Sequence, residues 1–145
     1  MVAPPTVLCH HVRMTVALVI GSILAALAAL VHVYIFVLES ILWSRPTTWR
    51  IFGLRTQADA DTTRPLAYNQ GFYNLFLALG IAVGLLLYGA SFTAGVALVL
   101  AGTVSMVLAA TVLITSSPLS ARPAAVQGLL PLLATVLIAI ALAGG

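Results

Sequence analysis

Four long runs of apolar residues dominate the hydrophobic pattern of the chain, and short polar stretches separate them. A transmembrane helix needs about 20 predominantly apolar residues to cross the hydrocarbon core of a bilayer. Each run is close to that length, and Gly, Ser and Pro punctuate the breaks. The pattern therefore predicts an all-α fold, a polytopic membrane protein built as a bundle of four transmembrane helices. The expected spans cover about residues 14–40, 67–88, 94–115 and 124–143.

These spans define one domain. We expect residues 14–145 to form a single four-helix membrane domain. Residues 1–13 lack the pattern of the first span, and we expect them to form a disordered N-terminal tail.

The composition excludes soluble classes of protein. Hydrophobic residues make up 62% of the 145 residues and charged residues 6%, and the mean hydropathy is +1.17. A soluble domain carries about 25% charged residues, so this chain cannot build a water-facing surface. The net charge of +3 rests on a few charges beside apolar spans and does not indicate a nucleic-acid partner. The single cysteine, Cys9, excludes an intrachain disulfide and a cysteine metal motif, and we expect no metal and no cofactor.

The arginines set the expected orientation. Positive charges favour the cytoplasmic side of short loops. Five of the six arginines fall in two connections that share a side: Arg45, Arg50, Arg55, Arg64 and Arg122. We therefore expect a multi-pass protein of the cell (inner) membrane, with a cytoplasmic connection over residues 41–66 and both termini outside.

The connection over residues 41–66 has a pattern of its own. Aromatic residues alternate with the arginines in its first half: Trp43, Trp49 and Phe52. Aromatic rings and guanidinium groups favour the headgroup region, so we expect an interfacial anchor, with a lid over a site as the alternative. Thr56 followed by Asp59 resembles a helix N-terminus, but we expect Pro65 to interrupt a helix that continues into the second span.

Small residues recur at intervals of four in three spans. They are Gly21, Ala25 and Ala29, then Gly80 and Gly84, then Ala97, Ala101, Ser105 and Ala109. Lipid gives helices no hydrophobic incentive to associate, so small residues at close contacts matter. The stripes predict a tight bundle, and they would also permit a homo-oligomer.

The first span ends in HVYIFVLE, which places a histidine and a glutamate seven positions apart. At about 100° per residue, seven positions return to nearly the same helix face. Gly21, Ala25, Ala28, His32 and Glu39 therefore share one stripe, and its small residues predict that it faces other helices. We expect Glu39 to point inward near the cytoplasmic end and His32 to lie about 10 Å deeper.

The second span begins with a cluster of polar residues in the stretch YNQGFYN. We expect Asn69 and Tyr73 to point inward because they share a face with Gly80 and Gly84. Polar groups in hydrocarbon need partners, so clustering them at one end is favourable. The predicted polar site uses Glu39 and His32 as candidate acid–base catalytic groups. Its candidate ligand-binding residues are Asn69, Gln70, Tyr73, Asn74 and Gln127.

A purely structural interpretation of the same residues stays open. Amides near helix ends often hydrogen-bond other helices and stabilise a bundle. Glu39 would then reach the headgroups or pair with Arg45 or Arg50, and His32 would be a satisfied core residue.

The same stretches resemble a family of small four-helix integral membrane proteins, the domain-of-unknown-function family 1304. The resemblance covers nearly the whole chain from Met14 onward, and Pro65 is a departure that puts the start of the second helix in doubt. It implies four helices and a membrane location, and it implies no particular activity. It rests on HVYIFVLE, on Phe52-Gly53-Leu54, on Asn69-Gln70-Gly71-Phe72-Tyr73-Asn74 and on Gln127-Gly128.

Four functional hypotheses remain open at this point. The first is a pocket, open to the cytoplasmic leaflet, that binds a hydrophobic or lipid-like small molecule. The second is a membrane-embedded enzyme of isomerase, cyclase or epoxide-opening type that uses Glu39 and His32. The third is a transporter component, although no internal repeat supports it. The fourth is a structural membrane protein.

Overall fold

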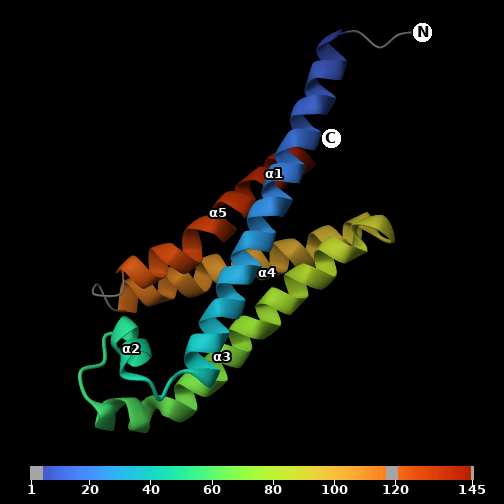
Figure 1. The fold of residues 1–145 in the computed structure, drawn as a ribbon. Helices are drawn as coiled ribbons and strands as arrows, with labels where there is room; N and C mark the ends of the chain where they lie inside the picture. Colours follow the sequence, from blue (N-terminus) through green and yellow to red (C-terminus); the bar gives the residue numbers. More distant parts are fainter. Residues whose placement is uncertain (1–4, 117–120, 145) are drawn as a thin grey trace.

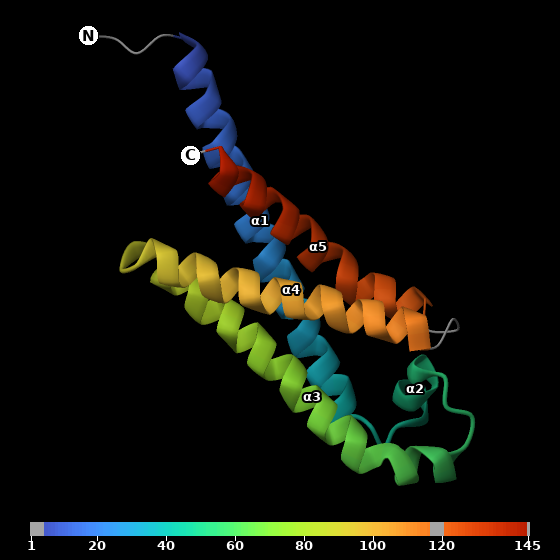
Figure 2. The same ribbon diagram turned by 180° about the vertical axis from the view of Figure 1, so that it is seen from behind.

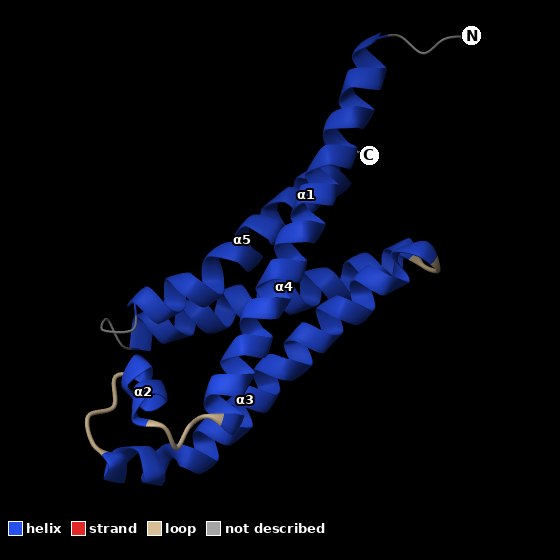
Figure 3. Ribbon diagram, viewed as in Figure 1, coloured by secondary structure: helices blue, strands red, loops and turns tan. Residues whose placement is uncertain are grey.

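The computed structural model describes residues 5–116 and 121–144, and within them every regular element is helical (Figure 3). The all-α class expected from the sequence is confirmed. The elements are α1 (Pro5–Phe36), the π-helical η1 (Val37–Ile41), α2 (Pro46–Trp49), η2 (Arg50–Phe52), α3 (Gln57–Leu86), η3 (Leu87–Gly89), α4 (Phe92–Ser116) and α5 (Ala121–Ala143).

Four stretches are long and apolar enough to cross a membrane, which agrees with the number expected. They are Val12–Ile41, Gln57–Gly89, Phe92–Ser116 and Ala121–Ala143. Two starts differ from the expectation. Helix α1 begins at Pro5, so residues 5–13, which we expected to be a disordered tail, are helical; residues 1–4 lie outside the described part. Helix α3 begins at Gln57 rather than near residue 67.

Pro65 lies inside α3 and does not interrupt it, so that expectation is wrong. Proline lacks the N–H that would bond the carbonyl four residues earlier, and its ring crowds that turn. Two contacts hold the turns before it. The Thr56 hydroxyl accepts a hydrogen bond from the Asp59 backbone N–H at 3.1 Å, which caps the helix as the sequence predicts. The indole N–H of Trp43 donates to the carbonyl of Ala60 at 2.9 Å. The helix bends near its start and continues (Figure 1).

The four long helices pack as a closed ring of neighbours, in which each helix contacts two others. Helix α1 packs on α3 and α5, and α4 packs on the same two helices, whereas α1 and α4 barely touch. Both ribbon views show that the pair α1–α5 diverges from the pair α3–α4 toward the termini (Figures 1 and 2). The core lies where the pairs cross, and its fully buried members include Ala25, Ile81, Val99, Met106 and Ile138.

The predicted stripes of small residues lie on packed faces in some helices and not in others. On α1 the buried residues Gly21, Ala25 and Ala29 form a packed face, as predicted. A Cβ on Gly84 would lie 2.8 Å from the Gly95 carbonyl, so α3 and α4 touch through their backbones there, but Gly80 faces open space.

The stripe expected on α4 is on the wrong face. Its members Ala97, Ala101, Ser105 and Ala109 are exposed. The packed face runs instead through Gly95, Val99, Gly102 and Met106. Alanine and glycine are so abundant in α4 that a spacing of four fits more than one face.

A compact cap covers one end of the bundle. We use "the cap" for residues 42–67, which include α2, η2 and the first turns of α3. Trp43 and Trp49 are 7% and 3% exposed and pack with Ala60 and Ala67. The rings therefore form a small core of their own, and the interfacial position of the segment stays a prediction. Gly53 makes the turn after η2 with a φ of 83°, a left-handed conformation that favours glycine.

Candidate functional site

The end of the first span is a π-helix rather than a continued α-helix. The backbone N–H of Leu42 donates to the carbonyl of Val37, five residues earlier, at 2.9 Å. Single π-helical turns are rare in proteins, and those that occur often lie at functional sites. This turn contains Glu39, and both Leu38 and Glu39 are buried in it.

The carboxyl group of Glu39 points into the contact between η1 and α3. The residue is 3% exposed, and its Oε2 accepts a hydrogen bond from the side-chain amide of Asn74 at 3.0 Å. The same amide donates to the carbonyl of Gln70 at 3.1 Å. Within residues 5–116 and 121–144 this is the one hydrogen bond of the Glu39 side chain, and no arginine forms an ion pair with it. The structural alternative of a Glu39–Arg45 or Glu39–Arg50 pair is therefore not realised here.

Three further contacts join the same two segments. The Ser40 hydroxyl donates to the carbonyl of Tyr68 at 3.0 Å. The rings of Phe36 and Phe72 meet edge to face with centroids 5.1 Å apart. A Cβ on Gly71 would collide with the Ser40 hydroxyl and lie 3.2 Å from Cβ of Glu39, so only glycine allows this approach.

We call this contact the seam, defined by Phe36, Glu39 and Ser40 on one side and Tyr68, Gly71, Phe72 and Asn74 on the other. The stretches HVYIFVLE and YNQGFYN, singled out in the sequence, pack against each other here. Sequence reasoning did not single out Ser40 or the steric role of Gly71. The signals for Gly71 were its place in the stretch YNQGFYN and its position at the start of a transmembrane helix.

His32 lies on the predicted stripe and is 2% exposed. Its Nδ1 hydrogen-bonds the carbonyl of Ala28 at 2.9 Å. A carbonyl can only accept, so Nδ1 carries the hydrogen and Nε2 of the neutral ring is an acceptor. The expected stripe of Gly21, Ala25, Ala28, His32 and Glu39 is buried throughout and faces other helices.

The other candidate ligand-binding residues are not gathered around Glu39. Asn69, Gln70 and Tyr73 are exposed, and Tyr73 is 66% exposed, so the expectation that Asn69 and Tyr73 point inward is wrong. The face was inferred from Gly80, which borders open space, whereas the packed face of α3 runs through Ala67, Gly71 and Ala78. Asn74 alone bonds Glu39.

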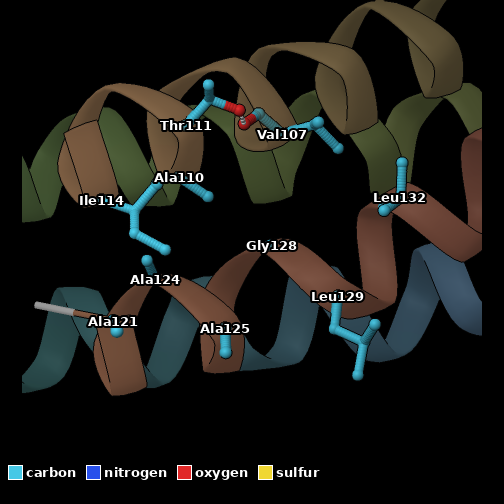
Figure 4. A pocket seen from close by; sticks show the side chains of 10 residues that line it. All are labelled: Val107, Ala110, Thr111, Ile114, Ala121, Ala124, Ala125, Gly128, Leu129 and Leu132. Atoms are coloured by element: carbon cyan, nitrogen blue, oxygen red, sulfur yellow. Dashed lines mark hydrogen bonds between the residues drawn. The ribbon is translucent and has the colours of Figure 1, made fainter. Parts of the chain in front are cut away.

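Gln127 lies half-buried near the start of α5, and no hydrogen bond links it to Glu39. Its neighbour Gly128 contributes to a shallow pocket of about 260 Å³ between α4 and α5. Apolar side chains such as Ile114 and Leu129 line this pocket, and Thr111 points its hydroxyl back to the Val107 carbonyl (Figure 4).

A second pocket of about 350 Å³ lies between α1 and the end of α3, next to Ser22 and Tyr88. Neither pocket includes Glu39 or His32. In the part of the chain that the structure describes, no group of three or more His, Cys, Asp or Glu side chains is placed to hold a metal ion.

The four apolar helices and the helical fold define the chain as a multi-pass, all-α membrane protein. Residues 26–139, which contain the seam and the cap, match the model of the family described as Protein of unknown function (DUF1304). The chain belongs to that family, as the resemblance indicated. No curated protein and no solved structure matches the chain.

Proposed function

We propose that this membrane protein binds a hydrophobic, lipid-like small molecule whose polar head reaches the Glu39–Asn74 pair. The observation that carries the proposal is the buried carboxyl group of Glu39, with one hydrogen bond and no ion pair within the described residues. Ionisable groups inside a membrane span are costly, and by default they indicate function.

The chemistry of the head follows from the unused capacity of the carboxyl group. A carboxylate has about four acceptor positions, and Asn74 fills one of them. A hydroxyl or amine on a lipophilic molecule would fill others. Asn74 is half-buried and Gln70, one turn away, is exposed. We therefore place the approach to Glu39 at the side of the bundle, over Asn74, with the ligand's tail along the apolar helices. On the orientation expected from the arginines, this end faces the cytoplasmic leaflet.

Acid–base catalysis is the second candidate, and the placement of His32 favours it. Its Nε2 is the acceptor of the neutral ring, and the residue lies on the same buried stripe as Glu39. The two residues are about 10 Å apart along the helix axis at 1.5 Å per residue. One substrate would have to extend along about two turns of α1 to meet both groups.

The test compares small molecules that copurify with the protein. We would extract wild type, Glu39→Gln and Asp59→Asn in native lipid discs and identify bound molecules by mass spectrometry. Glutamine keeps an acceptor for Asn74 and removes the acid. Asp59→Asn makes the same chemical change at an exposed carboxyl outside the seam and serves as the matched control.

A species enriched in wild type and Asp59→Asn but lost from a folded Glu39→Gln protein supports the proposal. Equal profiles in all three proteins, with equal thermal stability, contradict it. A His32→Gln protein distinguishes catalysis from binding alone. If this variant retains a molecule that differs chemically from the one bound to wild type, the difference would indicate that wild type converts it.

A further inference from the structure

The cap carries four arginines that no acidic residue neutralises within the described part of the chain. Arg45, Arg50, Arg55 and Arg64 are all exposed, and none forms an ion pair there. The two aspartates of the same segment have other partners. Asp59 accepts a hydrogen bond from the Thr56 hydroxyl at 2.6 Å, and Asp61 accepts one from the Gln57 amide at 2.9 Å.

These arginines are mounted on a folded support. The Trp43–Ala60 hydrogen bond closes residues 43–60 into one unit. The Trp43 and Phe52 rings pack with centroids 5.2 Å apart, and the Leu54 backbone N–H bonds the Trp49 carbonyl at 3.3 Å. The backbone positions of Arg45, Arg50 and Arg55 are therefore set by the fold of the cap.

Trp49 supplies an independent observation. The residue is 3% exposed, and its indole N–H is buried without a hydrogen-bond partner among the described residues. Buried polar groups are nearly always paired, and an unpaired donor requires an explanation. The guanidinium group of Arg50 lies over the same ring, 5.2 Å from its centroid. Among the described residues, an indole donor without a hydrogen-bond partner and an arginine without an ion pair thus meet at one place on the cap.

We propose that the cap binds the phosphate headgroup of an anionic phospholipid, with Arg50 and its neighbouring arginines holding the phosphate and the Trp49 N–H donating to one of its oxygens. Guanidinium groups form paired hydrogen bonds to phosphate. The Arg50 side chain is exposed, so it can swing off the ring and let an oxygen reach the indole. The site is separate from Glu39 and does not depend on a ligand there.

The position of the cap selects a lipid over a soluble phosphate. Arg64 immediately precedes Pro65 and Leu66, and the long apolar run of α3 follows after the short polar stretch at residues 68–70. The exposed Arg122 lies in the first turn of α5 at the same end of the bundle, where the views place α2 beside the α4–α5 end (Figures 1 and 2). Basic residues next to a membrane span attract anionic lipids. The cap therefore stands at headgroup level.

The test uses the full-length protein in discs of phosphatidylcholine with or without phosphatidylglycerol. Native mass spectrometry would count the retained phosphatidylglycerol for wild type, Arg50→Gln, Trp49→Phe and Arg13→Gln. Arg13 lies on α1 toward the opposite end of the bundle and is exposed, so its variant is the matched control for charge. We expect Arg50→Gln to reduce retention about fivefold and Trp49→Phe to reduce it without a change in cap protection by hydrogen exchange. Arg13→Gln should retain lipid like wild type.

Two results would overturn the inference. One is equal retention of both lipids by wild type. The other is stabilisation by added inorganic phosphate in phosphatidylcholine discs with no response to phosphatidylglycerol, which would assign the site to a soluble anion. If Arg50→Gln retains less phosphatidylglycerol and Trp49→Phe retains as much as wild type, the Trp49 N–H does not contribute to the site. The outcome for Glu39→Gln is independent, so this inference and the proposed function fail separately.

Discussion

The seam and the cap both fasten α3 to the segment before it, and they use opposite means. In the seam, two helices approach until Gly71 touches Ser40, and a carboxyl–amide hydrogen bond joins them. In the cap, two large indole rings are buried among alanines. Within lipid, close backbone approach and polar contacts drive helix association, because lipid tails are as apolar as leucine. Near water, in contrast, burying the apolar surface of an aromatic ring is favourable. One helix therefore changes its mode of packing within about one turn, between Ala67 and Gly71.

The largest effect is expected from emptying the cap core with Trp43→Ala. Truncating a buried tryptophan costs about 3–5 kcal/mol, and this one also loses its hydrogen bond to Ala60. We expect the amides of residues 42–60 to lose protection in hydrogen exchange while the spans keep theirs. Ile51→Ala, at a 54% exposed position of the same segment, should leave the protection unchanged. Equal loss over cap and spans would show that the two regions are not separable.

The steric basis of the seam is tested by Gly71→Ala. The added methyl group would meet Ser40 and Glu39, and overpacking of this kind typically costs about 1–3 kcal/mol. Thermal unfolding in a mild detergent should therefore occur at a lower temperature. Gly80→Ala is the matched control in the same helix, because nothing lies within 4 Å of its added Cβ. It should stabilise α3 by up to about 1 kcal/mol. Equal shifts from the two variants would contradict the close contact at Gly71.

The polar bond of the seam should have a smaller effect. Asn74→Ala removes the one hydrogen-bond donor to Glu39 within the described residues. Side-chain hydrogen bonds between membrane helices average about 0.6 kcal/mol and reach about 1.7 kcal/mol, and we expect a loss in this range. Glu39→Gln keeps an acceptor and should be close to neutral. An unfolding temperature for Asn74→Ala that is no lower than that of wild type, in the same thermal assay, would contradict a stabilising bond between the two side chains.

The smallest effect concerns a bond between two hydroxyls outside the seam and the cap. Thr135 donates to Thr103 at 2.9 Å, which links α5 to α4. Thr135→Ala should cost about 0.6 kcal/mol in the same unfolding assay. Thr111→Ala, whose hydroxyl bonds only its own helix at Val107, should cost less. A larger loss of stability for Thr111→Ala than for Thr135→Ala would contradict the idea that hydrogen bonds between helices stabilise this bundle more than those within one helix.

The four spans and the buried stripe of α1 could be predicted from the sequence. The length of an apolar run indicates a membrane span, and residues seven apart lie on the same face of a helix. The sequence was insufficient where two faces carry similar residues. On α4, a spacing of four among abundant alanines selected the exposed face. On α3, Gly80 gave the wrong inward direction, and Asn69 and Tyr73 followed it.

The contacts of the seam could not be predicted from either helix alone, because they depend on how the two segments pack against each other. Asn74 was a candidate from the sequence, but its partner depends on how α1 meets α3. The π-helical turn at Glu39 has no local signal in the stretch VLESI. The helix through Pro65 was missed for the same reason, since Trp43 supports that turn from another segment.

The unequal lengths of the helices have a consequence for the surrounding membrane. At 1.5 Å per residue the 23 residues of α5 extend about 35 Å, only slightly more than a hydrocarbon core of about 30 Å, whereas the 33-residue stretch from Gln57 to Gly89 extends about 50 Å. The excess of α3 projects at the cap end, and that of α1 projects beyond the end of α5 on the side of the termini (Figure 1). Helix α5 is therefore the long helix with the least length to spare, and we expect a thicker bilayer to meet its first mismatch there.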